Sequence, residues 1–82
     1  MATRQEDITM RESERATGVR DEDYDIVSTL YHALQAADTA EKYIGDADQE
    51  GDQEAKQFFQ EVQDHNRRIA ERAKQLLTQR IS

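Results

Sequence analysis

The sequence contains no cysteine, no proline and no tryptophan among its 82 residues. The missing cysteine excludes a disulfide framework, a thiolate metal site and a cysteine nucleophile. No run of about 20 apolar residues is present, so no segment is expected to span a membrane. The N-terminus is polar from residue 3 to residue 7 and lacks the pattern of a secretory signal. These absences predict a cytoplasmic protein.

The sequence also has fewer basic than acidic residues, with 11 Lys and Arg against 18 Asp and Glu, which gives a formal net charge of -7. A protein that binds nucleic acid by neutralising phosphates needs the opposite balance, so no nucleic-acid partner is expected. The sequence has no glycine-rich phosphate loop and no Ser, His and Asp at the spacing of a catalytic triad. A non-catalytic protein of one small domain is therefore the leading interpretation.

Residues 1–20 lack a periodic pattern, since their large apolar residues are Ile8, Met10 and Val19 alone. Such a segment buries too little apolar surface to offset its conformational entropy, so we expect a disordered tail. Residues 21–82 then form the folded part of the chain.

An amphipathic helix is predicted over about residues 22–50. Apolar residues fall on one face of it at 100° per residue, namely Ile26, Val27, Leu30, Ala33, Leu34, Ala37 and Ile44. Acidic residues from Asp21 to Asp25 stand at its start, where carboxylates favour the helix dipole. Gly45 is the position at which this predicted helix is least stable, because glycine inside a helix costs about 1 kcal/mol relative to alanine.

A second amphipathic helix is predicted over about residues 52–80. Its apolar stripe consists of Ala55, Phe59, Val62, Ile69, Ala73, Leu76 and Leu77. Gly51 suits the position that follows a helix C-terminus, and Asp52 suits an N-cap. The connection is therefore very short, and the fold class is all-α, an antiparallel two-helix hairpin. With a turn near residue 50, Leu30 is expected near Ile69, Leu34 near Asn66 and Ala37 near Val62.

A hairpin of this size has a small core and no disulfide to stabilise it. We therefore expect a homo-oligomer in which two hairpins make a four-helix bundle. The expected interface residues are Leu30, Leu34, Phe58, Phe59, Asn66 and Ile69. A buried Asn66 is expected to fix the register and the oligomeric state, as a single asparagine does in coiled coils.

Residues 24–35, 58–63 and 72–77 resemble a ferritin-like helical hairpin, the half-bundle form of small encapsulated ferritins and of short ferritin-like bacterial proteins. The resemblance lies in the lengths and general texture of the helices. It implies a four-helix bundle, oligomers and often a carboxylate-bridged di-iron site between the helices.

The di-iron site of that family needs an inward glutamate on the first helix and an inward Glu-x-x-His on the second. Here Glu61 is followed after three residues by Asp64, and His65 comes one position later. Glu41 is the one carboxylate at the expected inward positions of the first helix. Two alternatives follow: a non-catalytic ferritin-like assembly or interaction module without a cofactor, and an iron-binding protein with ferroxidase-type activity that uses Glu41, Glu61 and His65.

A third, weaker alternative is calcium binding. Residues 46–51 match the first half of an EF-hand loop, including the glycine at its sixth position. The twelfth position, which should be a bidentate glutamate, is Gln57. The competing interpretation of the same residues is an acidic helix end followed by a two-residue turn.

Overall fold

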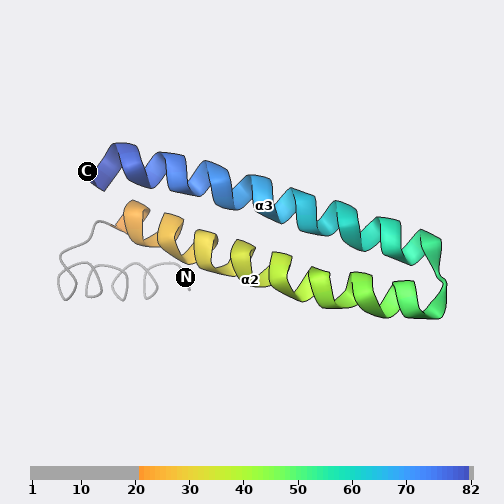
Figure 1. Ribbon diagram of the computed structural model, residues 1–82. Coiled ribbons are helices and arrows are strands. Elements are labelled where there is room, and N and C mark those ends of the chain that lie inside the picture. The colour runs from red at the N-terminus through yellow and green to blue at the C-terminus, as the bar shows by residue number, and fades with distance from the viewer. Residues whose placement is uncertain (1–20, 82) are drawn as a thin grey trace, which may run out of the picture.

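The structure, a computed structural model, describes residues 21–81 and consists there of two long helices, α2 (Asp21–Glu50) and α3 (Gln53–Ile81). The helices lie side by side and run in opposite directions (Figure 1). No strand occurs within this range. The predicted all-α hairpin is therefore confirmed, whereas the expected tail over residues 1–20 lies outside the described residues.

The turn between the helices is closed by the backbone of Gly51 and Asp52. Gly51 has a φ of 71°, in the left-handed region that glycine adopts without a steric penalty. Its N–H donates to the Asp48 carbonyl at 3.1 Å, and the Asp52 N–H donates to the Ala47 carbonyl at 2.9 Å. This pair of bonds is a Schellman motif, which satisfies carbonyls at the end of α2. The role expected for Gly51 is confirmed.

Asp52 caps the start of α3. Its Oδ1 accepts a hydrogen bond from the Ala55 N–H at 3.0 Å, so a backbone donor that the helix itself leaves free is satisfied. Beside it, Lys56 Nζ on α3 donates to Asp48 Oδ1 on α2 at 2.8 Å. The short turn and this ion pair hold the two helices together at one end.

The register of the hairpin differs from the expected one. Contacts between the helices join Asp23 to Arg80, with 3.6 Å between Oδ1 and NH1, and Glu41 to Gln63, with 2.6 Å between Oε2 and Nε2. Compared with a pairing of Leu34 and Asn66, α3 is displaced by two to four residues in the contacts of Tyr43 with Phe59, Asp23 with Arg80 and Glu41 with Gln63. The reason is that the turn is centred between Gly51 and Asp52 and not at residue 50.

Alanine forms the seam where the helices touch. The buried apolar residues are Ala33, Ala37, Ala40 and Ala47 of α2, with Ala70 and Ala73 of α3. Their spacings are four, three and seven residues on α2 and three residues on α3, which are the spacings of a coiled-coil contact. No leucine, isoleucine, valine or aromatic side chain in residues 21–81 is buried.

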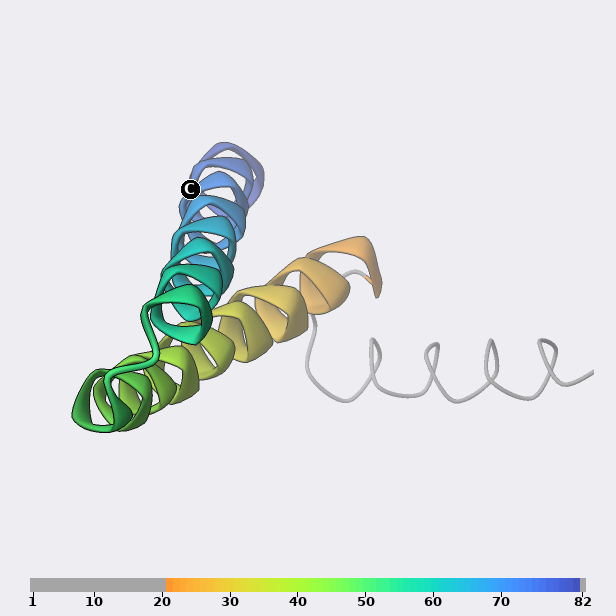
Figure 2. The same cartoon turned by 90° about the vertical axis from the view of Figure 1, so that its right-hand side faces the viewer.

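The expected inward face was therefore wrong in part. Leu34 is 46% exposed, and Glu41 is also exposed. Leu30, Asn66 and Ile69 are half-buried beside the seam and not within it. Small side chains let two helices approach closely, so the alanines occupy the line of closest contact and the larger residues lie to its sides. Figure 2, seen from the turn, shows that the two helix axes are inclined to each other.

Gly45 within α2 and Gly51 just after it provide a matched test of where α2 ends. Gly45 lies within α2 with open space around its Cα, so Gly45→Ala should raise the free energy of unfolding by about 1 kcal/mol. Gly51→Ala should lower it by a similar amount, about 1 kcal/mol, because alanine is strained at positive φ. Urea unfolding of both variants at one protein concentration checks this. Equal effects of the same sign would contradict the assigned turn.

Candidate functional site

An apolar groove runs along one side of the hairpin between the two helices. Three hollows make it up, of about 310, 500 and 200 Å³ from the turn to the open end. Spacings of three and four residues place most groove residues of α2 on one stripe: Asp25, Thr29, His32, Ala36, Thr39, Tyr43, Asp46 and Glu50. Ile26, Gln35, Ala40 and Ala47 line the groove beside this stripe. The α3 residues are Ala55, Phe58, Phe59, Val62, Ile69, Arg72, Ala73 and Leu76.

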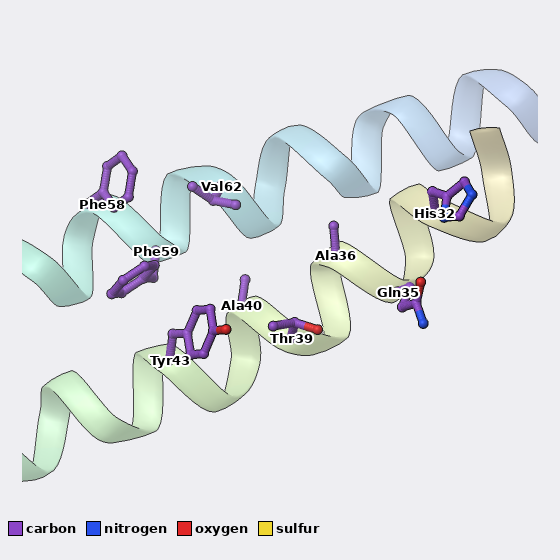
Figure 3. Close-up of a pocket in the computed structure, with 9 residues that line it drawn as sticks. All are labelled: His32, Gln35, Ala36, Thr39, Ala40, Tyr43, Phe58, Phe59 and Val62. Atoms are coloured by element: carbon purple, nitrogen blue, oxygen red, sulfur yellow. The ribbon is translucent and has the colours of Figure 1, made fainter.

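Three aromatic rings gather in the half of the groove nearer the turn. The rings of Tyr43 and Phe59 face each other across the two helices, with centroids 5.3 Å apart (Figure 3). Phe58 contacts Phe59 at the same centroid distance and projects outward from α3. Tyr43 remains 47% exposed and Phe58 57% exposed. This aromatic cluster, Tyr43, Phe58 and Phe59, is the bulkiest part of the groove.

Small side chains line the middle of the groove. Ala36, Thr39 and Ala40 on α2 face Val62 on α3 around the hollow of about 500 Å³ (Figure 3). Beyond it, toward the open end, Ile69 and Leu76 lie opposite Ile26 and Thr29. Asp25 and Arg72 line the same end section. The aromatic cluster therefore stands between the hollow of about 310 Å³ at the turn and the hollow of about 500 Å³, and it lines both of them.

The chemistry of the groove is that of a contact surface. The aromatic and aliphatic side chains dominate its walls, and the carboxylates of Asp46, Glu50 and Asp52 stand at the turn end. An exposed apolar surface of this length is typical of an interaction site.

A second group of exposed apolar residues lies elsewhere on α2. Tyr24, Val27, Tyr31 and Leu34 follow one another at spacings of three and four residues, and all are at least 45% exposed. None of them lines the groove. Of the expected interface residues, Leu34 thus belongs to this outer stripe, whereas Phe58, Phe59 and Ile69 belong to the groove.

A polar contact inside the seam is a feature that the sequence did not predict. Gln63 is buried, and its Nε2 donates both to the Ala37 carbonyl at 3.2 Å and to Glu41 Oε2 at 2.6 Å. Gln63 occupies a seam position, four residues after Phe59 and three before Asn66. The three- and four-residue spacing of Gln63 relative to these neighbours could have identified it as a seam residue. A pattern restricted to apolar residues does not include glutamine.

The candidate iron ligands are not brought together within one hairpin. Glu41 is engaged by Gln63, whereas Glu61 and His65 are exposed on α3. Residues 21–81 contain no group of three or more His, Cys, Asp or Glu placed to hold a metal ion. An iron site that uses Glu41, Glu61 and His65 stays a prediction, and a second copy of the chain would have to complete it.

Asn66 is half-buried, and its Nδ2 donates to the Val62 carbonyl of its own helix at 2.9 Å. One of its two amide hydrogens is thus used within the hairpin, and a role in selecting the oligomeric state stays a prediction.

The calcium-loop interpretation is wrong. Asp46, Asp48 and Glu50 lie within α2, and Gln57 lies within α3, so residues 46–57 form no twelve-residue loop. Because the Schellman bonds end α2 and the Asp52 cap begins α3, an acidic helix end and a two-residue turn account for these residues.

Comparisons with known proteins find no match to this chain among protein-family models, curated proteins or solved structures. Neither α2 nor α3 has an apolar stretch of the length that a membrane crossing requires. The functional argument therefore rests on the groove and the seam themselves.

The contact between Glu41 and Gln63 predicts unequal effects of two similar substitutions. Glu41→Ala removes a hydrogen bond to a charged group and should lower the free energy of unfolding by about 1 kcal/mol. Asp38→Ala removes another exposed carboxylate of α2 and should change it by less than about 0.5 kcal/mol. Chemical denaturation measures both, and equal losses would mean that the contact contributes nothing to stability.

Proposed function

We propose that this protein is a non-catalytic, self-assembling helical module whose groove is covered by a second copy of the same chain. Two hairpins that pair through the groove make a four-helix bundle, which is the half-bundle organisation that the ferritin-like resemblance implies. A cytoplasmic location, expected from the sequence, is part of the same proposal. The observation that carries it is the exposed aromatic cluster above a seam made of alanine.

The alanine seam explains why a second layer is needed. Hydrophobic stabilisation scales with the apolar area removed from water, at about 25 cal/mol per Å². The buried apolar side chains of residues 21–81 are all alanines, which offer little area. The larger apolar residues that line the groove stay half-buried or exposed, and Phe58 is an example. A second copy that covers the groove would bury them and supply the core that one hairpin lacks.

A structural role also fits the apolar lining of the groove. Its walls are aromatic and aliphatic, and its charged groups stand at the ends. Interfaces between permanent subunits are apolar in this way and resemble a domain core cut in half. The proposed activity is therefore self-assembly. The surfaces outside the bundle would remain available for contact with other molecules.

Two aromatic residues of nearly equal exposure give a matched test. Phe58 lies in the aromatic cluster and is 57% exposed, while Tyr31 lies on the outer stripe and is 60% exposed. We expect the full chain, 9.5 kDa, to sediment as a dimer in analytical ultracentrifugation. Phe58→Ser should weaken the dimer by about 100-fold in Kd, because about 1.5 kcal/mol is lost from each copy. Tyr31→Ser should leave the Kd unchanged.

Two results would overturn the proposal. One is a parent protein that stays monomeric at concentrations of about 100 μM, where even a weak dimer forms. The other is a dimer that is insensitive to Phe58→Ser and lost on Tyr31→Ser, which would move the contact to the outer stripe. Circular dichroism of both variants shows that the helices are retained.

A further inference from the structure

One of the two histidines of the chain, His32, lines the groove. It stands at the middle hollow, the one of about 500 Å³, at the end that lies away from the aromatic cluster (Figure 3). The other residues around this hollow are apolar or carry amide, hydroxyl or phenol groups. His32 is therefore the lining residue whose charge changes between about pH 5 and pH 8. The second histidine, His65, is exposed on α3 and lines none of the three hollows.

We propose that His32 makes the self-assembly pH-dependent, with a neutral imidazole in the dimer and release of the second copy on protonation. This inference rests on the proposed function, because it assumes that a second copy covers the groove. His32 is exposed in the single hairpin, so water can solvate its imidazolium form there. A cover over the middle hollow removes that water, and a charge taken out of water without a countercharge is unfavourable.

The neighbours of His32 on α2 supply no countercharge. Gln35 and Thr39 line the same hollow and can form hydrogen bonds with a neutral imidazole, but neither carries a charge. The ring of Tyr31 contacts that of His32, with 5.4 Å between centroids, and a phenol is uncharged in this pH range. The carboxylate of Asp25 lies two helical turns away and lines the next hollow together with a cation of α3.

The facing helix supplies no countercharge either. Because Arg80 lies opposite Asp23, the charged residues of α3 at the level of residues 31–35 are Arg68, Glu71 and Arg72. Arg68 and Glu71 are exposed and line none of the hollows. Arg72 lines the hollow toward the open end, and its positive charge does not favour a second positive charge beside it.

The second copy leaves His32 without a countercharge in both possible orientations. A copy that covers the whole groove sets its middle section against the middle section of the first. With both turns at one end, the two His32 side chains come close together, and two imidazolium charges repel each other. With the turns at opposite ends, His32 meets the half of the middle hollow nearer the turn, lined by uncharged residues such as Thr39 and Tyr43. The dimer therefore binds fewer protons than two separate hairpins, and it weakens as the pH falls.

The sign of this effect separates it from the general effect of acid on the chain. At a formal net charge of -7, two copies repel each other, and protons taken up by exposed side chains reduce that repulsion. The carboxylates of Asp46, Glu50 and Asp52 at the turn end act in the same direction when they are protonated. General protonation thus strengthens the dimer at lower pH, whereas exclusion of a proton from His32 weakens it.

Sedimentation of the full chain at about pH 7.5 and about pH 5.5 tests the proposal, with the two histidines as a matched pair. The dimer Kd should rise by about 10- to 100-fold at the lower pH, because most free imidazoles are protonated there and each dimer excludes up to two protons. His65→Gln should keep this rise. His32→Gln should abolish it and leave a Kd that is constant or falls on acidification.

Three results would overturn the inference and leave the proposed function intact. They are a parent dimer whose Kd does not rise at the lower pH, a rise that survives His32→Gln, and a rise that His65→Gln abolishes. Circular dichroism at both pH values shows whether a rise that survives His32→Gln comes from acid unfolding. A parent chain that is monomeric at about pH 7.5 and about 100 μM overturns the inference and the proposed function together.

Discussion

The close contact of alanines between α2 and α3 is the constraint on which the rest of the structure depends. A helix pair can approach closely only where side chains are small, and here alanines recur at the seam positions of both helices. Once the alanines occupy that line, every larger apolar residue must lie to one side of it. The groove, the aromatic cluster and the outer stripe all follow from the placement of alanines at the line of closest contact.

A seam of small residues also makes the hairpin depend on polar contacts to fix its register. Alanines slide past one another with little change in packing, so they do not by themselves select one alignment. The alignment is set by the Schellman turn at Gly51, by the bond from Gln63 to Glu41 and by the ion pair of Asp23 with Arg80. A glutamine inside a seam is therefore a positioning device, and its two acceptors both lie on α2.

The alanine seam also bears on the assembly function proposed for this 82-residue chain without disulfides. Within one hairpin the contact area is small, and the residues that would form a core face outward. Pairing with a second hairpin would convert these residues into a core, so folding and assembly would become one process. The large apolar side chains of the groove would then be kept for the contact between copies.

The sequence by itself determined the local structure. The apolar periods predicted two helices, and Gly51 and Asp52 predicted the turn that joins them, because glycine at positive φ and an N-cap carboxylate act through neighbouring backbone groups. The tertiary structure decided which face of each helix touches the other. A hydrophobic stripe is dominated by large residues such as Leu34, whereas the line of closest approach selects small ones such as Ala33 and Ala37. The groove likewise depends on the register between helices, which nothing within either helix specifies.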